Sequence, residues 1–108
     1  VTLNDVQFVE AARHLAQQVL QQPEPDVDGR LQLVADKLLA RKFLPAELAI
    51  VHESLQSLAA HYAQHAEDAA RVIAVGESPV DPQLPPTDLA AWTMLVNQLL
   101  NLDEVLNK

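Results

Sequence analysis

Two histidines spaced one helical turn apart, His61 and His65, are the clearest candidates for metal chemistry in this chain. On a helix, this spacing places two imidazoles on one face, where they can share one metal ion. The pattern supplies neither the glutamate of a His-Glu-x-x-His motif nor a third ligand, because His52 lies about half a turn away from that face. We favour a solvated polar face, with metal binding as the alternative.

A second candidate is the acidic segment 24–29, in which Glu24, Asp26 and Asp28 alternate with other residues and a glycine follows. This pattern follows the first half of a calcium-binding EF-hand loop. The twelfth position of such a loop supplies a bidentate carboxylate, and here that position is Ala35. The favoured interpretation is an interhelical loop in which Asp28 caps the next helix. Calcium binding is the alternative.

Aromatic and acidic residues toward the C-terminus allow two further interpretations. Trp92 occupies an apolar stripe at helical spacing, so we predict that it is a core residue rather than a stacking surface for sugar. Asp103 and Glu104 are adjacent, and adjacent side chains diverge on a helix, which favours a solvated or interdomain role over acid–base catalysis. The serines have no His–Asp companions at recognisable spacing. We therefore expect no catalytic residue in this chain.

Five predicted helices position these residues, and they define an all-α fold with a compact orthogonal or bundle arrangement. Apolar residues recur at helical spacing, and prolines or glycines separate the runs. His61 and His65 are placed on the third helix, and Ala70 and Ile73 are predicted to face inward on the fourth, which ends at Gly76. The first helix is predicted to extend to about residue 22, and the second from residue 30 to a break near 41–44. The third is predicted to begin at Pro45, the fourth to span 67–75, and the fifth to begin at Pro86.

The last predicted helix has a broad apolar face, which indicates contact with several neighbours near the centre of the bundle. The crossing that leads to it, residues 77–86, holds four prolines and cannot form a regular helix. We expect this crossing to pack back on the chain's own helices; docking against another part of the polypeptide is the alternative. The predicted interaction surface consists of Val80, Leu84, Trp92, Asp103 and Glu104.

Composition excludes several classes of function. Seven basic and fifteen acidic residues give a formal net charge of −8, which disfavours nucleic acid and anionic lipid as partners. The absence of cysteine excludes disulfides, thiolate catalysis and a Cys-x-x-Cys-His haem attachment. No apolar run approaches the roughly 18 residues of a membrane span. We therefore predict a single helical domain over residues 1–108, without a cofactor of its own and without membrane insertion. Arg13 and Arg41 are isolated cations, which we expect to pair with carboxylates.

Five short segments carry a family resemblance when they are taken together. They read Leu-Asn-Asp at 3–5, Phe-Val-Glu-Ala-Ala at 8–12, Ala-Val-Gly-Glu at 74–77, Leu-Ala-Ala-Trp at 89–92 and Asn-Leu-Asp-Glu at 101–104. The combination resembles the planctomycete C-terminal domain of unknown function, which closes large exported proteins that carry a planctomycete-type cytochrome c domain. The resemblance spans essentially the whole chain. It departs from the family at Val6 and at Arg41-Lys42, where family members often have proline.

The resemblance implies a C-terminal fragment of a longer multidomain protein that is exported to a periplasmic or extracytoplasmic location. Haem would then belong to an upstream domain, and the upstream domains would be the partners. The family has no agreed catalytic residues, so the expected function is a non-catalytic structural and interdomain docking module.

Its association with polysaccharide use gives the alternatives. One is a carbohydrate-binding module that uses Trp92, Tyr62 and the acidic loop. The other is part of a polysaccharide-processing site completed by upstream domains, with carboxylates from Glu77, Asp81, Asp103 and Glu104.

Overall fold

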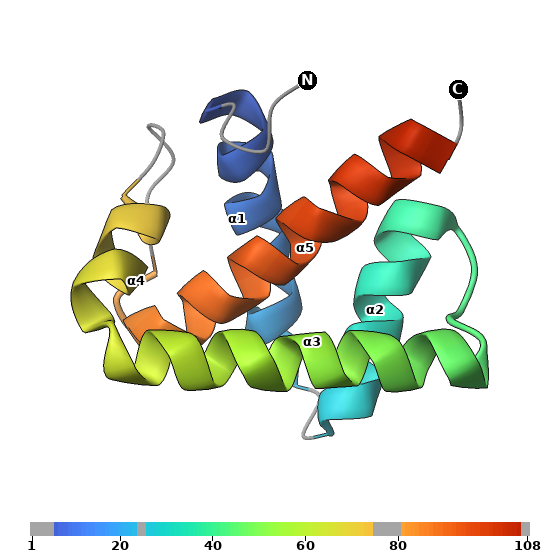
Figure 1. Cartoon of the computed structure of the whole chain (residues 1–108), viewed down its shortest axis with the longest axis horizontal. Helices are drawn as coiled ribbons and strands as arrows, with labels where there is room; N and C mark the ends of the chain where they lie inside the picture. The colour runs from blue at the N-terminus through green and yellow to red at the C-terminus, as the bar shows by residue number, and fades with distance from the viewer. Residues whose placement is uncertain (1–5, 24–25, 75–80, 107–108) are drawn as a thin grey trace.

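The computed structural model describes the backbone of residues 6–23, 26–74 and 81–106, and the side chains of residues 9–23, 26–74 and 81–100. The described part contains five α-helices and no strand, which confirms the all-α prediction (Figure 1). In chain order the helices are α1 (Val6–Gln21), α2 (Val27–Leu39), α3 (Pro45–Gln64), α4 (Ala66–Ile73) and α5 (Pro86–Leu106).

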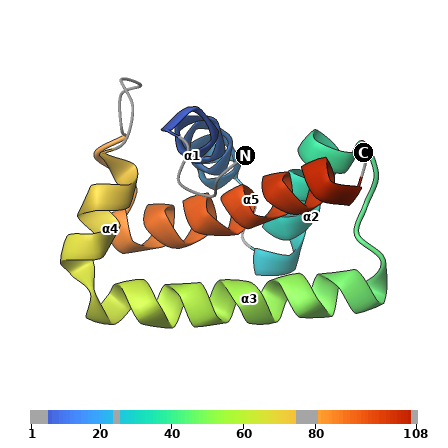
Figure 2. The same cartoon turned by 45° about the horizontal axis from the view of Figure 1, so that its top comes forward.

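The last helix, α5, is the centre of the fold, as its broad apolar face predicted. It makes its most extensive contacts with α1, α3 and α4, whereas α2 packs against α1 and α3. Figures 1 and 2 both show α5 running between α1 and α3. A helix with neighbours on several sides must be buried over most of its circumference. Its buried residues are Leu89, Ala90, Ala91, Trp92, Thr93, Leu95, Val96 and Asn97.

Small residues line the contact between α1 and α5. Ala12 and Ala16 on α1 and Ala90 on α5 are fully buried. Because the distance between packed helices depends on the side chains at the contact, alanines let two backbones approach closely. The other helices contribute larger apolar side chains to the same core. The buried members are Leu31, Val34 and Ala35 on α2, and Val51, Leu55 and Tyr62 on α3.

The start of α2 differs from the prediction. The helix begins at Val27, so Asp28 lies in its first turn and is not the capping residue. Asp26 occupies the N-cap position but makes no side-chain capping hydrogen bond. A carboxylate in the first turn is favourable because it faces the positive end of the helix dipole. The sequence pattern could not distinguish these two roles, since capping and first-turn positions both favour aspartate.

The connection between α2 and α3 is held by side chains rather than by capping alone. The Gln32 amide pairs with the backbone of Phe43: its Oε1 accepts from the Phe43 N–H at 2.7 Å and its Nε2 donates to the Phe43 carbonyl at 3.3 Å. The carboxylate of Glu47 accepts from both guanidinium nitrogens of Arg41, at 2.9 and 3.1 Å, and from the Leu44 N–H at 2.8 Å. The prediction of a carboxylate partner for Arg41 is thus confirmed.

The fourth helix is shorter than predicted and turns a different face inward. It ends at Ile73, two residues before the predicted Val75, and Gly76 lies outside the described residues. Ala69 is buried and Ala70 is exposed, so the inward assignment of Ala70 was wrong; Ile73 packs against the core as predicted. A helix of eight residues offers too few apolar positions to define its rotation from sequence.

One buried cation joins α1 to the end of α4. The side chain of Arg13 is almost completely buried, and its Nη1 donates to the carbonyl of Ile73 at 2.7 Å. The last carbonyls of a helix lack intrahelical partners, so a guanidinium is well suited to this position. The contact ties the short helix to the centre of the fold.

Candidate functional site

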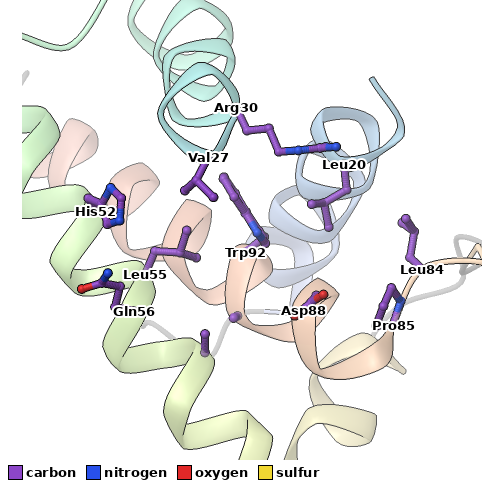
Figure 3. A pocket seen from close by; sticks show the side chains of 12 residues that line it. Leu20, Val27, Arg30, His52, Leu55, Gln56, Leu84, Pro85, Asp88 and Trp92 are labelled. Atoms are coloured by element: carbon purple, nitrogen blue, oxygen red, sulfur yellow. The ribbon is translucent and has the colours of Figure 1, made fainter. Parts of the chain in front are cut away.

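A cleft opens where α2, α3 and α5 meet the end of α1 (Figure 3). Its volume is about 500 Å³. Four of its lining residues are polar, namely Arg30, His52, Gln56 and Asp88, and the others are apolar. The main apolar walls are formed by Leu20, Val27, Leu55, Leu84, Pro85 and Trp92.

Trp92 lies in the core and also forms part of the cleft. Only 6% of its surface is exposed, which confirms the prediction of a core residue. Its indole ring lies between Val27 and Leu20, and the ring nitrogen is on the edge that faces Leu20 and Asp88 (Figure 3). Among the described residues, the indole N–H has no hydrogen-bond partner. The cleft therefore presents a hydrogen-bond donor that has no acceptor among the described residues.

Two of the polar side chains at the cleft are held by the protein itself. Nη1 of Arg30 donates to the Val19 carbonyl at 2.9 Å, near the end of α1. Nδ1 of His52 lies 2.8 Å from Oδ1 of Asp28. Because a carboxylate only accepts hydrogen bonds, Nδ1 must carry the proton in this contact. These bonds fix the positions of both basic groups.

The remaining polar side chains, Asp88 and Gln56, are uncommitted. Neither makes a hydrogen bond or an ion pair within the described part of the chain. Asp88 is exposed in the first turn of α5, where the helix dipole favours a negative charge. Its carboxylate is therefore available at the rim of the cleft.

Within the acidic segment predicted to resemble a calcium loop, Val27 lines the cleft and Asp28 contacts the lining residue His52. Asp28 belongs to α2 and bonds His52, and Glu24 lies outside the described residues. In the described ranges no three histidine or carboxylate side chains form a group that could hold a metal ion. The structure instead gives Asp28 a definite role in positioning an imidazole, which the sequence analysis missed.

The two histidines at helical spacing lie at the junction of α3 and α4, away from the cleft. The prediction that both belong to the third helix was wrong for His65, which follows the last helical residue, Gln64. Their rings stack with centroids 4.4 Å apart, and Nδ1 of His65 donates to the His61 carbonyl at 2.8 Å. Nε2 of His61 lies 3.9 Å from Oδ2 of Asp68.

The predicted interaction surface is only partly described. Leu84 and Trp92 meet at the cleft, whereas Val80 and the side chains of Asp103 and Glu104 lie outside the described residues, as does Glu77 of the polysaccharide-processing alternative. Leu84 also packs against the hydrophobic core. The described end of the proline-rich crossing thus packs back on the helices, as expected.

Asp81 anchors this end of the crossing to α1. Its Oδ2 accepts from Nε2 of Gln21 at 2.9 Å, and its backbone N–H donates to Oε1 of Gln17 at 3.0 Å. The bond from Gln21, followed by that from the Gln83 N–H, lowers the pKa of the Asp81 carboxyl below its ordinary value. The carboxylate is engaged in fixing the loop.

Val27, Arg30 and Asp88 were not identified from the sequence. Asp88 follows a proline that opens a helix, which marks it as a first-turn acid but not as part of a cleft. The cleft arises from the relative orientation of three helices, and no motif in the chain encodes that orientation.

Comparison of the chain with protein-family models, with curated proteins and with solved structures found no match. In the described ranges, no helix has the length and apolar character that crossing a membrane requires.

Proposed function

We propose that this domain is a non-catalytic docking module and that its partner binds in the cleft between α2, α3 and α5. The observation that carries the proposal is the cleft itself, with its mainly apolar walls and a volume of about 500 Å³. Binding sites in proteins are typically concave, largely apolar and about 300–1,000 Å³ in volume, with a few placed polar groups. The cleft meets each of these criteria.

The chemistry of the lining favours binding over catalysis. No serine, threonine or lysine lines the cleft, and the chain has no cysteine, so the described lining contains no hydroxyl, thiol or amine nucleophile. His52 is the only imidazole in the lining, and Asp28 holds its Nδ1. An imidazole and a carboxylate without a hydroxyl, thiol or amine nucleophile support recognition better than group transfer.

Apolar surface extends outward from the cleft at Val27. This residue lies at the cleft on the first turn of α2, and 41% of its surface is exposed. An exposed apolar side chain next to an apolar hollow enlarges the area that a partner can cover. This continuity supports a docking surface rather than an isolated pocket.

The proposed partner follows from the family resemblance. We propose that the chain closes an exported protein with a planctomycete-type cytochrome c domain, and that the cleft binds the domains that precede it. Haem would be carried by those domains and not by this one. The acidic charge of −8 further favours a partner with a basic surface.

The carbohydrate-binding alternative has less support. Sugar sites commonly present an aromatic ring to the ligand, and the phenylalanine, tyrosine and tryptophan side chains that the structure describes are all buried. Tyr62 is 7% exposed and Trp92 only 6%. The cleft reaches the edge of one ring and offers no open aromatic face.

Association of two separately produced chains tests the docking proposal. The isolated domain is mixed with the preceding domains of the complete polypeptide, and binding is measured by isothermal titration calorimetry. We expect saturable association that Ala59→Leu weakens at least tenfold, because Ala59 lines the cleft and a larger side chain fills it. Ala60→Leu, at an exposed position on the same helix, is the matched control. Absence of association, or equal loss in both variants, would contradict the proposal.

A further inference from the structure

The geometry points to a specific occupant of the cleft: a peptide segment of the partner that carries an aliphatic side chain and, on the same side, a lysine or arginine. This inference rests on the proposed docking function and names the chemistry that the site recognises. It combines three features of the cleft, namely its apolar walls, the indole N–H of Trp92 and the carboxylate of Asp88.

The apolar walls define the first requirement. Leu20, Val27 and Leu55 come from three different helices and converge on the Trp92 ring (Figure 3). Burying an aliphatic side chain of the leucine or isoleucine type in such a site is favourable because it removes apolar surface from water on both partners. A wholly polar segment would gain nothing from these walls.

The indole N–H of Trp92 defines the second requirement. The residue is more than nine-tenths buried, and its N–H lacks an acceptor within the described chain. A partner that covers the cleft removes the remaining water, so it must bring an acceptor or leave a buried donor unsatisfied. A peptide segment brings a backbone carbonyl at every residue, which fits this need.

The carboxylate of Asp88 defines the third requirement. Of the polar groups at the cleft, Arg30 donates through Nη1 to the Val19 carbonyl and His52 is bonded to Asp28, while Asp88 has no partner among the described residues. At the rim, Asp88 is therefore the acidic group that remains open to a cation of the partner. The overall charge of −8 attracts cations in the same sense. A lysine or arginine beside the aliphatic anchor would be attracted both by the Asp88 carboxylate and by the net negative charge of the domain.

Capped tripeptides provide the test, because residues i and i+2 of an extended peptide lie on the same side. Three probes are compared: acetyl-Leu-Ala-Lys-amide, acetyl-Leu-Ala-Glu-amide and acetyl-Ala-Ala-Lys-amide. The chain has one tryptophan, so a ¹⁵N-labelled sample gives one indole N–H resonance that reports directly on Trp92. We expect the Leu–Lys peptide to shift this resonance saturably and to bind at least threefold more tightly than either of the other two.

Substitutions in the domain test whether the peptide binds at the cleft. Asp88→Asn should weaken binding of the Leu–Lys peptide about three- to fivefold, the range for an exposed ion pair. Glu67→Gln removes an equal charge from α4, outside the cleft, and should leave binding unchanged. Ala59→Leu should abolish the indole shift. A fold check by circular dichroism accompanies each variant.

Three outcomes would overturn the inference: no indole shift with the Leu–Lys peptide, equal or tighter binding of the Leu–Glu peptide, or binding that Asp88→Asn and Glu67→Gln weaken equally. Tighter binding of the acidic peptide would mean that Arg30 dominates recognition. Failure of the peptides alongside intact association of the two chains would remove only this inference. Loss of that association alongside peptide binding would remove the docking function instead.

Discussion

The buried guanidinium of Arg13 illustrates how an ionic side chain can serve the packing of an apolar core. Its position within α1 directs it to the last carbonyl of α4, Ile73, at 2.7 Å. The sequence shows an arginine between Ala12 and His14 but gives no sign that its hydrogen bond reaches a residue 60 positions away. This bond to a backbone carbonyl is a separate contact from the predicted pairing of Arg13 with a carboxylate, which stays a prediction.

Replacing Arg13 by methionine should destabilise the domain by about 2 kcal/mol, since the partly buried Ile73 carbonyl loses a charged donor. The free energy of unfolding is measured by urea titration, followed by Trp92 fluorescence. Arg71→Met serves as the control because the Arg71 side chain is 76% exposed, and it should cost less than about 0.5 kcal/mol. Equal costs for the two substitutions would show that the bond to Ile73 is unimportant.

The lowered pKa of the Glu47 carboxyl predicts how the stability of the domain depends on pH. The hydrogen bond from Arg41, followed by that from the Leu44 N–H, lowers its pKa from 4.5 to about 2. A carboxyl with a lowered folded-state pKa stabilises the fold fully above its unfolded pKa and loses that contribution as pH falls. The melting temperature should therefore fall between pH 4.5 and about 2 more steeply in the wild type than in Glu47→Gln.

High salt provides the check on this pH dependence, because the pair is exposed and salt screens exposed charges. Raising the ionic strength should reduce the difference between the wild type and Glu47→Gln. If, at low salt, the melting temperature of the wild type fell with pH no more steeply than that of Glu47→Gln, the assigned role of Glu47 would be contradicted.

Among the helices, the link between α2 and α3 shows a local conflict between residue type and backbone. Ala40 has φ 57° and ψ 27°, a left-handed conformation that glycine adopts more readily than any residue with a Cβ atom. Its N–H bonds the Asp36 carbonyl at 3.2 Å and so closes the helix. Sequence patterns predict glycine at such a position, and an alanine there does not indicate that a helix ends.

Substituting glycine for Ala40 should stabilise the domain by about 0.5–1 kcal/mol, because relief of backbone strain exceeds the added entropy of the unfolded chain. Urea unfolding measures the change. Ala60→Gly, within α3, should have the opposite sign, with a loss of about 1 kcal/mol. Destabilisation by Ala40→Gly would contradict the conformation described for this residue.

The sequence predicted much about the helices themselves. Pro45 and Pro86 mark the first residues of α3 and α5, since proline suits a first helical turn. The apolar stripe that contains Trp92 identified the central helix. Errors arose where several local solutions are nearly equivalent: Asp28 suits both a cap and a first turn, and the short α4 left its inward face undetermined.

For the fold as a whole, the sequence predicted the all-α class but not the arrangement of helices that forms the cleft. Amphipathic helices with one very apolar member indicate an all-α core around that member, and α5 indeed contacts α1, α3 and α4. The cleft depends on how α2 and α3 diverge beside α5, which is set by packing of many side chains over long sequence separations. For this reason Val27, Arg30 and Asp88 are recognised as neighbours only in three dimensions.

The central claim, that a partner covers this cleft, is tested most directly by amide hydrogen exchange. The first amides of a helix have no intrahelical acceptor and exchange rapidly when exposed to solvent. In α2 and α5 these are the amides of residues 27–29 and 87–88, and among these residues Val27 and Asp88 line the cleft. The corresponding amides of α4, residues 66–68, lie away from it and serve as the internal control.

Exchange is compared between the isolated domain and the complete polypeptide. The account predicts slower exchange at residues 27–29 and 87–88 in the complete polypeptide, with no change at 66–68. Identical exchange at all these positions, or protection confined to 66–68, would contradict it.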